Sequence, residues 1–521
     1  MKVTELKNKY EKSAAMGSKS SETVVGGFFL ENEQTLRLRV NGYELDIALD
    51  KNEAYYDVKT LNTEFMVKFE LMSKLPVSVY IYENKLSPNA PSGIKIDRIA
   101  YDKVIPVRIE DGTETRMAYI RTLNSNIPTY TIAGEITDKK YTQGYYYITH
   151  LLLPVMLKLN QRGEIVYYLC ANEYMAKVKG MLLSDSEQFV QVMSYWDFKR
   201  HDLEGGKVRY SYHEQNPAYN RLNFFGYAGG CRVIMDEQYN VINRITMKPT
   251  NPNNDVDPSL NAVDGHDFYM FNDNHYILSG YELKLVHNII PPELNPHPQG
   301  SKVIASHIQE VKEGKVVFNW YSTDYPELYE LWDEDKNEYD NKESQQFDYA
   351  HFNSMDIHPD GSLVCSFRHL CTILKIDRNN GKIIWKLSGR KDEFGLSEHQ
   401  KTSRQHYVYF MKDGDKLYLT LFDNNYRYRE SRVIKLRLDE QNKKLLEWKA
   451  YKVPGHYSEA CGSAMYLGNE VFVIGWGLST DDGASLTEID FRENNGQGKK
   501  LFELTFPKGL NATYRCSKFM K

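Results

Sequence analysis

Several features that mark common classes of protein are missing from this sequence. Charge of one sign is not in excess, because 65 lysines and arginines stand against 70 aspartates and glutamates. The resulting net charge of −5 gives no reason to expect nucleic acid or an anionic membrane as a partner. The most apolar run, ITHLLLPVMLKL, is too short to cross a bilayer and contains Pro154.

Cysteine is scarce, and its spacing argues against a metal or redox motif. None of the six cysteines forms a CxxC pair, so neither a zinc ribbon nor a thioredoxin-like site is predicted. The first 20 residues, MKVTELKNKYEKSAAMGSKS, also lack the apolar segment of a signal peptide. We therefore expect buried thiols and a cytoplasmic protein, or a periplasmic one if a leader has been removed.

The familiar catalytic motifs of nucleotide and hydrolase chemistry are absent as well. The sequence has no GxSxG elbow, no Walker loop and no GxGxxG turn. Nothing in it therefore predicts a nucleotide or any other cofactor.

The chain is rich in segments with the residue pattern of β-strands. Residues 1–135 are expected to form a first domain. FFLENEQTLRLRVNGYELDIAL predicts two strands joined at the hairpin dipeptide Asn41-Gly42. EFMVKFELM and VSVYIYEN continue the pattern. We predict a small β-sandwich-like domain, whose exposed strand edges make it a candidate interface for a homodimer.

Residues 136–521 contain a repeated sequence motif, in which a polar turn with Gly or Asn precedes an apolar strand. Six copies favour six blades of a β-propeller over a generic run of hairpins. The predicted fold is therefore all-β, with a six-bladed propeller as the second domain. The copies are NQRGEIVYYL, DEQYNVINRI, VKEGKVVFNW, DRNNGKIIWKL, DEQNKKLLEW and RENNGQGKKLFEL.

A second sequence motif lies between copies of the first and carries a histidine before a turn. Aligned on the aspartate of the turn, the histidine precedes it by 7, 9 and 7 residues in three copies. These differences are all odd, so strand alternation aims the three side chains the same way. Equivalent positions in successive blades surround the propeller axis, and the sequence thus predicts a central cluster of His266, His351 and His406.

The stretch AHFNSMDIHPDGSLVCSFRH adds an arginine to this cluster. Its HPDG segment predicts a tight turn closed by His358 and Gly361. In that register His351 faces Arg368, and His369 points to the opposite face of the hairpin.

Three histidines and an arginine without a carboxylate pair suit an anionic group. Glycosidases need two flanking carboxylates, and an arginine beside histidines opposes a zinc ion, so no metal site is predicted. Arginine binds a tetrahedral oxyanion through two hydrogen bonds, and neutral histidine attacks as a nucleophile or moves protons. Sulfuryl or phosphoryl transfer fits this set.

At these residues the sequence resembles the bacterial arylsulfate sulfotransferase family, over most of residues 120–480. The resemblance implies a six-bladed propeller with the active site in its central funnel. It also implies transfer of a sulfuryl group from an aryl sulfate to a phenol, by a ping-pong route through a sulfohistidine and without the nucleotide donor PAPS. The matching segments are GHDFYMFNDNHYIL, AHFNSMDIHPDGSLVCSFRH, ILKIDRNNGKIIWKLSG, RQHYVYF, LFDNN and SRVIKLRLDE.

The resemblance carries roles onto particular residues. His406 of RQHYVYF matches the nucleophile. His351, Arg368 and His266 match residues that bind the sulfuryl oxygens and assist the leaving phenol, and Asn353 is a further candidate for substrate binding. Whether His351 or His266 transfers the proton stays open.

One departure and two alternatives accompany this interpretation. Family members often carry a disulfide shortly before the nucleophile, but no cysteine lies between Cys371 and His406. One alternative is a sulfatase or phosphatase, in which water replaces the phenol at the same site. The other is a non-catalytic propeller that binds proteins or glycans, since fold does not fix function.

Overall fold

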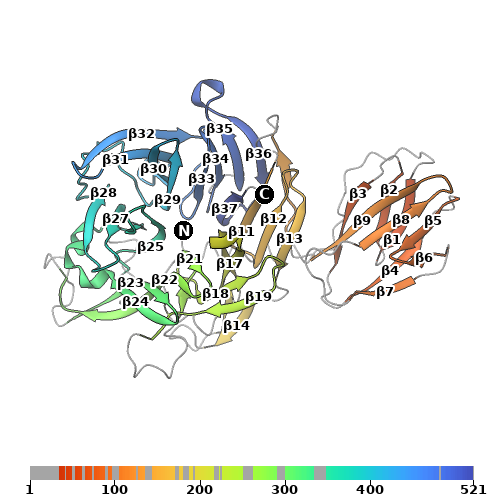
Figure 1. The fold of residues 1–521 in the computed structure, drawn as a ribbon, viewed down its shortest axis with the longest axis horizontal. Helices are drawn as coiled ribbons and strands as arrows, with labels where there is room; N and C mark the ends of the chain where they lie inside the picture. Colours follow the sequence, from red (N-terminus) through yellow and green to blue (C-terminus); the bar gives the residue numbers. More distant parts are fainter. Residues whose placement is uncertain are drawn as a thin grey trace. The chain divides into compact units, whose positions relative to one another are not determined.

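The structure is a computed structural model, and its described residues form two compact units (Figure 1). One unit comprises Tyr130–Ile165 and Glu173–Lys521, and the other comprises Glu11–Thr129 and Val166–Asn172. The predicted boundary at residue 135 stays a prediction. The structure describes residues 35–40, 43–49, 53–60, 65–72, 76–87, 92–96, 105–124, 127–134, 143–170, 175–179, 187–191, 194–215, 222, 226–249, 262–289, 300–333, 348–479 and 483–519.

The smaller unit consists of two sheets around one hydrophobic core. Leu36 and Leu38 of the first sheet share a buried cluster with Val79 and Ile120 of the second. The predicted hairpin is confirmed by the pairing of β1 with β2 up to Val40 and Tyr43, although its dipeptide lies outside the described residues. The first sheet has the order β2 (Tyr43–Ala48), β1 (Thr35–Val40), β4 (Phe65–Leu71) and β7 (Ser92–Ile96). The second has the order β3 (Glu53–Thr60), β9 (Thr115–Asn124), β8 (Ile105–Glu110), β5 (Ser78–Ile81) and β6 (Asn84–Lys85).

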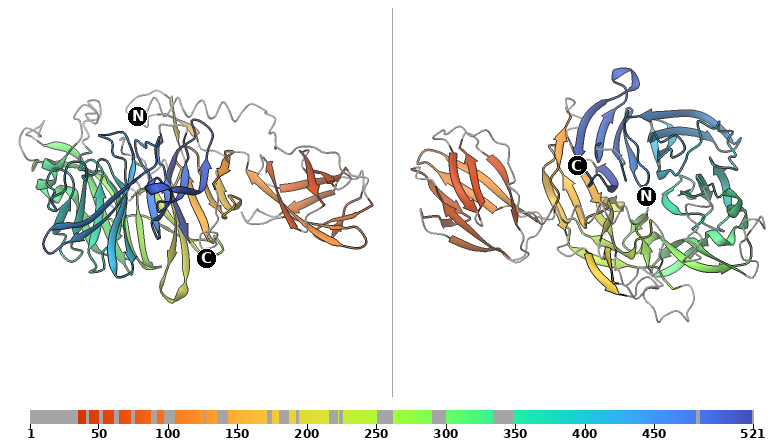
Figure 2. Two further views of the ribbon diagram at one scale, coloured as in Figure 1. Left: turned by 90° about the horizontal axis from the view of Figure 1, so that it is seen from above. Right: turned by 180° about the vertical axis from the view of Figure 1, so that it is seen from behind.

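The larger unit is also all-β, and its described strands form six main sheets. Figures 1 and 2 show these sheets around a common centre. Three of them follow one another along the chain as four-stranded antiparallel meanders. They are β21 (Phe268–Asn272), β22 (His275–Val286), β23 (Ser301–Lys312) and β24 (Lys315–Tyr321); β25 (Phe352–Ile357), β26 (Leu363–Phe367), β27 (Thr372–Ile376) and β28 (Ile383–Leu387); and β29 (His406–Asp413), β30 (Lys416–Asp423), β31 (Arg432–Asp439) and β32 (Lys444–Lys452).

The other three sheets take an additional strand from elsewhere in the chain. β16 (Tyr195–Asp202), β17 (Val208–Gln215), β18 (Gly229–Met235) and β19 (Val241–Ile245) are joined by β20 (Val263–Asp264). β33 (Ser463–Gly468), β34 (Val471–Gly475), β35 (Leu486–Asp490) and β36 (Lys499–Thr505) are joined by β10 (Thr131–Ala133). β11 (Tyr145–His150) and β12 (Val155–Leu159), which β13 (Ile165–Cys170) follows, are joined by the last strand, β37 (Thr513–Phe519).

The remaining described elements are short. β14 (Met175–Lys179) and β15 (Glu187–Gln191) pair as a ribbon. The helices are 3-10 turns at η2 (Glu204–Gly206), η7 (Ser322–Asp324), η8 (Pro326–Leu331) and η9 (Asn494–Gly496). Among the residues that the structure describes, no helix has the length and apolar character that crossing a membrane requires.

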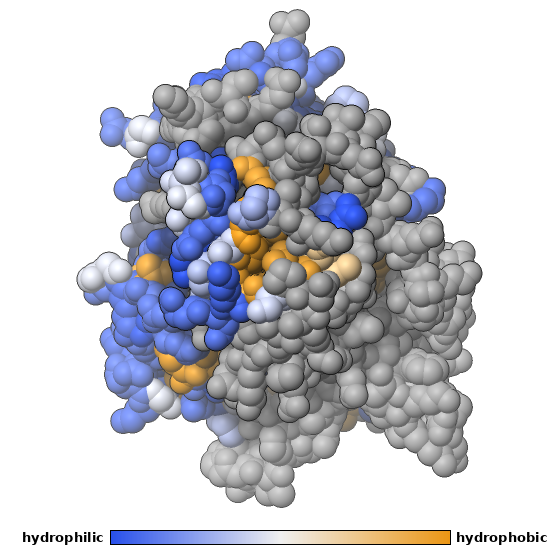
Figure 3. Space-filling view, turned by 90° about the vertical axis from the view of Figure 1, so that its right-hand side faces the viewer, coloured by the Kyte–Doolittle hydropathy of each residue, from blue (hydrophilic) through white to orange (hydrophobic). Residues whose placement is uncertain are grey.

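The repeated sequence motif lies at an equivalent turn in each of the six sheets. Its copies begin at the turns that follow β12, β18, β23, β27, β31 and β35. Hydrophobic clusters fill the spaces between neighbouring sheets, and Trp320 of β24, for example, lies 5.7 Å from Phe367 of β26 between ring centroids. On the face drawn in Figure 3, by contrast, hydrophilic residues cover most of the coloured surface.

One strand from each of the six sheets lines a central cavity of about 710 Å³. These strands are β16, β21, β25, β29, β33 and β37. Buried charges in the wall of the cavity connect several of these strands. Asp197 binds both Arg232 and Arg515 at 2.9 Å, and Arg515 also lies 3.0 Å from Asp267.

We predict that Asp197→Ala lowers the free energy of unfolding by about 3–5 kcal/mol, because it removes the carboxylate from two buried guanidinium groups. The matched control is Asp202→Ala on the same strand, whose carboxylate is 60% exposed beside Arg200 and should contribute at most about 1 kcal/mol. Urea denaturation followed by circular dichroism measures both. Equal losses in the two variants would contradict the prediction.

Candidate functional site

The structure brings the three predicted histidines and Arg368 together where the central strands begin. His266 precedes β21 by two residues, His351 precedes β25 by one, and His406 is the first residue of β29. The ring centroids of His266 and His351 are 5.0 Å apart, with the rings nearly perpendicular. His406 is close enough to His266, His351 and Arg368 for their charges to act on it.

The hairpin that carries two of these residues differs from its predicted register. Its closure by His358 and Gly361 is wrong by one residue, because the N–H of His358 donates to the carbonyl of Ser362 at 2.9 Å. The loop is therefore one residue longer than a two-residue turn. Gly361 still donates its N–H to the carbonyl of His358 at 2.8 Å, as in a turn followed by a glycine bulge.

A second irregularity restores the predicted neighbours at the other end. The register shifts between Phe352 and Ser354, and beyond this bulge the N–H of Arg368 donates to the carbonyl of His351 at 2.8 Å. His351 itself has a φ of +53°, which is unusual for a residue other than glycine. Backbone conformations of this kind are characteristic of functional sites.

His406 is fixed in one tautomer by its surroundings. Its Nδ1 lies 2.6 Å from Oδ1 of Asn424 and 3.0 Å from the carbonyl of Arg404. The amide nitrogen of Asn424 donates to the carbonyls of Ser458 and Cys461, so its oxygen must face His406. Since both neighbours of Nδ1 are acceptors, Nδ1 carries the proton and Nε2 keeps a lone pair.

The ring of His406 is also held neutral. Burial and the charge of Arg368 keep its pKa well below that of free histidine, and the hydrogen bond that Nδ1 donates to Asn424 opposes this only in part. A neutral imidazole with a free Nε2 is the nucleophilic form of histidine.

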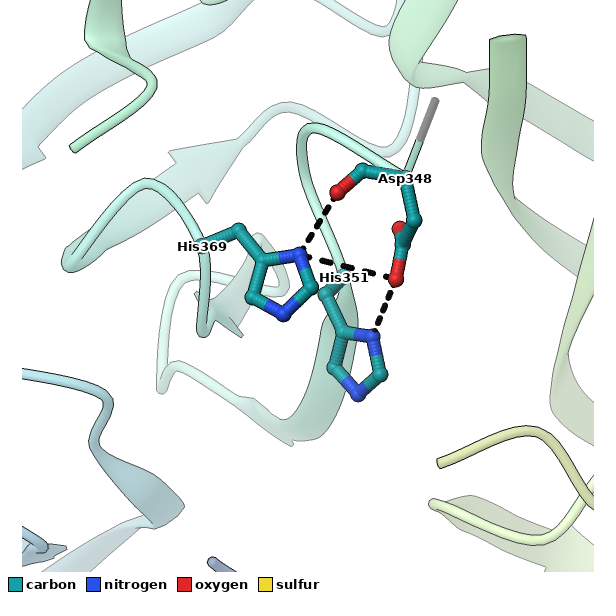
Figure 4. Close-up of side chains that lie close together, drawn as sticks. All are labelled: Asp348, His351 and His369. Carbon is teal, nitrogen blue, oxygen red and sulfur yellow. Dashed lines mark hydrogen bonds and ion pairs between the residues drawn. The ribbon is translucent and has the colours of Figure 1, made fainter. Parts of the chain in front are cut away.

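His351 belongs to a buried trio with Asp348 and His369 (Figure 4). Its Nδ1 lies 2.5 Å from Oδ2 of Asp348, while Nδ1 of His369 lies 2.6 Å from the backbone carbonyl of Asp348. The prediction that His369 points away is wrong, because its ring centroid lies 4.5 Å from that of His351. Burial raises the pKa of Asp348 to about 8, against the charges of His266 and Arg368.

Among the described residues, the same trio is one of two places where possible metal-ligand atoms lie close together. The potential ligand atoms of Asp348, His351 and His369 lie within 4.8 Å of one another. They are already hydrogen-bonded within the trio, and the positive charge of Arg368 acts on all three groups. This environment opposes a cation.

The second gathering, His358, Asp360 and Glu440, already contains a cationic side chain. Nζ of Lys375 lies 2.7 Å from Asp360 and 2.5 Å from Glu440. The ammonium group therefore takes the position between the two carboxylates that a metal ion would need.

His266 stands among aromatic rings and has a carboxylate of its own. Its Nδ1 is hydrogen-bonded to Oδ2 of Asp264, which also accepts the backbone N–H of His266 at 2.9 Å. The ring lies edge-on to those of Trp196, Tyr281 and Tyr514, at centroid distances of 5.8, 6.0 and 5.9 Å. Such walls suit a flat aromatic ligand.

Asn353, the remaining predicted residue, has partners in the protein. Its amide nitrogen donates to the carbonyl of Gln405 at 2.7 Å, and its own carbonyl accepts from Arg515 at 2.8 Å. Asn353 thus connects the residue before His406 to Arg515, one of the buried charges in the wall of the cavity. None of the five predicted residues lines the 710 Å³ cavity itself, which lies along the later parts of the same strands.

Sequence reasoning missed the partners of the histidines. Asp264 and Asp348 precede their histidines by two and three residues, in DGH and DYAH. A short acidic spacing of this kind is a usable signal for a carboxylate–histidine pair. Asn424, in LFDNN, is 18 residues from His406 and gives no such local signal.

We predict from these contacts that Nε2 of His406 stays unprotonated between about pH 5 and pH 8. His358 is the internal contrast, because its hydrogen bonds to Glu440 and Asp360 raise its pKa although burial opposes this. Nitrogen-15 NMR of the imidazoles, assigned with His406→Gln and His358→Gln, measures both. A His406 that becomes protonated at a higher pH than His358 would contradict the assignment.

Comparison with known proteins identifies the family but adds little else. No curated protein sequence matches the chain. A protein of unknown function from Bacteroides caccae is 12% identical, covers 73% of this chain and 100% of its own, and has a TM-score of 0.38. Virginiamycin B lyase from Staphylococcus aureus is 8% identical, with coverages of 73% and 99% and a TM-score of 0.30. The Dos1 propeller is 10% identical, with coverages of 84% and 89% and a TM-score of 0.31. These TM-scores are too low to support an inference.

The family match is extensive and includes the candidate site. The arylsulfotransferase (ASST) family matches residues 214–491, which is more than half of the chain. His266, His351, Arg368 and His406 all lie within this span. The chain therefore belongs to the arylsulfotransferase family.

Proposed function

We propose that this protein transfers a sulfuryl group from an aryl sulfate to a phenol without PAPS, by a ping-pong mechanism through a sulfohistidine at His406. The observation that carries the proposal is the free lone pair on Nε2 of His406, which Asn424 and the carbonyl of Arg404 enforce. Small-molecule aryl sulfates and phenols are the proposed partners, and no cofactor takes part.

Two half-reactions follow from this arrangement. Nε2 of His406 attacks sulfur, the bond between sulfur and the aryl oxygen breaks, and that oxygen leaves with the bonding electrons. An acceptor phenol oxygen then attacks sulfur, the N–S bond breaks, and the electron pair returns to Nε2. Arg368 binds the equatorial sulfuryl oxygens, whose negative charge is spread in the transition state.

The setting of this site completes the proposal. We propose that the six sheets are blades of a β-propeller spanning residues 136–521, with residues 1–135 as a separate β-sandwich-like domain. His351 and His266 bind sulfuryl oxygens and serve the departing phenol, and Asn353 supports the substrate side of the site. We also propose a cytoplasmic location, in keeping with six buried cysteines that form no disulfide bond.

The first test is release of 4-nitrophenol from 4-nitrophenyl sulfate, with and without added phenol and without PAPS. We expect release by the wild type that depends on phenol and falls by at least about 1,000-fold in His406→Ala, because the nucleophile is lost. The matched control is His399→Ala, which changes an exposed histidine outside the site and should leave turnover unchanged. Release that is indifferent to phenol would instead indicate a sulfatase. An active His406→Ala variant would refute the sulfohistidine.

Gly226 offers a second test, because its backbone lies against the candidate site. Its φ is +90°, and a Cβ there would fall 2.8 Å from Cε1 and 3.2 Å from Nε2 of His351. We predict that Gly226→Ala lowers kcat/KM by roughly 10- to 100-fold by displacing His351. The control is Gly509→Ala, at a φ of +83° in open space, which shares the backbone strain but not the contact. Equal kcat/KM in the two variants would contradict the placement of His351 in the site.

A further inference from the structure

The three histidines of the site differ in the oxygen that holds Nδ1. An uncharged amide and a backbone carbonyl hold His406, whereas carboxyl groups hold His266 and His351. The partner on Nδ1 decides how readily the other nitrogen of the ring carries a proton, because a carboxylate stabilises the imidazolium and an amide does not.

The two carboxyl groups are themselves in different surroundings. Both oxygens of Asp264 receive backbone N–H groups, Oδ2 from His266 at 2.9 Å and Oδ1 from Ala228 at 3.3 Å. These donors favour the ionised carboxylate. In addition, His266 and His213 lower the pKa of Asp264 although burial opposes them.

Asp348 has less support: the backbone N–H of His351 lowers its pKa, but burial outweighs this effect. Its Oδ1 is buried and has no hydrogen-bond partner among the described residues. A lone buried carboxylate oxygen favours the neutral acid, in line with the pKa of about 8. His351 beside it is also held neutral, because burial, His266 and Arg368 all lower its pKa.

We propose that His266, whose Nδ1 is hydrogen-bonded to Asp264, is the residue that donates a proton to the leaving phenolate, while Asp348 keeps His351 a neutral donor to a sulfuryl oxygen. This inference rests on the proposed function and decides between the two histidines that the sequence left open. Asp264, Asp348 and Asn424 are positioning residues, since each acts through the histidine that it holds.

His266 gives up one proton in the first half-reaction and regains one in the second. As the bond between sulfur and the aryl oxygen breaks, the proton on Nε2 of His266 passes to that oxygen, and a neutral phenol leaves. His266 then accepts the proton of the acceptor phenol while its oxygen attacks the sulfur on His406. Nδ1 of His406 keeps its proton throughout, because its neutral acceptors cannot take it, so the imidazole leaves as a neutral group.

The titratable groups around the Asp264–His266 pair come from several neighbouring elements. The charge of Asp264 raises the pKa of His213 in β17, which burial lowers, and those of Tyr227 and Tyr281. His266 acts on His351, His406 and Asp348. Within this described set Asp264 is the carboxyl group in contact with His266.

The test compares two donors whose phenols differ in acidity. Phenyl sulfate releases a phenol with a pKa of about 10, so it needs the proton, whereas 4-nitrophenyl sulfate releases a much weaker base. We expect Asp264→Asn to lower kcat/KM for phenyl sulfate by about 100-fold or more and for 4-nitrophenyl sulfate by less than about fivefold. Asp348→Asn should lower kcat/KM for both donors by the same factor.

Further variants keep the test decisive. His266→Gln should show the same dependence on the leaving group as Asp264→Asn, and it serves if Asp264→Asn does not fold by circular dichroism. Asn424→Asp should lower kcat/KM for both donors equally and add a pH dependence, because a carboxylate on Nδ1 favours protonation of His406.

The outcomes separate this inference from the proposed function. Equal losses for both donors in Asp264→Asn and His266→Gln would overturn the role of His266, even with an active wild type. A loss confined to phenyl sulfate in Asp348→Asn would assign the proton to His351 and also overturn it. A wild type that turns over neither donor would refute the proposed function itself.

Discussion

The buried ion pairs of Arg515 are the constraint on which the arrangement of this protein depends. Arg515 lies in the last strand, yet its guanidinium contacts Asp197 of β16, Asp267 before β21 and the carbonyl of Asn353 in β25. Placing these charges away from water is costly unless each has its partner. The central strands are therefore held at fixed positions around one side chain rather than by apolar packing alone.

The candidate active site lies next to these buried charges. Asp267 follows His266 directly, and Asn353 connects Arg515 to the carbonyl of Gln405, the neighbour of His406. Each histidine then receives its own oxygen on Nδ1. Rigid placement of this kind is what group transfer requires, since small displacements of a nucleophile cost large factors in rate.

The sequence allowed the strands and the gathering of the histidines to be predicted, because both follow from a repeated hairpin pattern. The register of the hairpins and the hydrogen-bond partners of the histidines were harder to predict. The loop after His358 is one residue longer than expected, and a bulge before Ser354 cancels that error, so His351 and Arg368 became neighbours for a different reason from the one predicted. A similar shift follows His406. Strict alternation does not hold across such bulges. Asn424 could not be found, because only the folded sheet brings it to His406.

The pairing of β37 with β11 has a consequence for how the protein is made. Tyr145 pairs with Phe519, so a strand that is made after the other described strands of this unit completes a sheet begun near its start. Contacts between such distant parts of a chain form slowly, because a long loop must close first. Arg515 arrives on that same strand. Until this strand has been made, Asp197 and Asp267 therefore lack the guanidinium group of Arg515. A nascent chain that stops before Arg515 cannot complete the buried ion pairs at the centre of the larger unit.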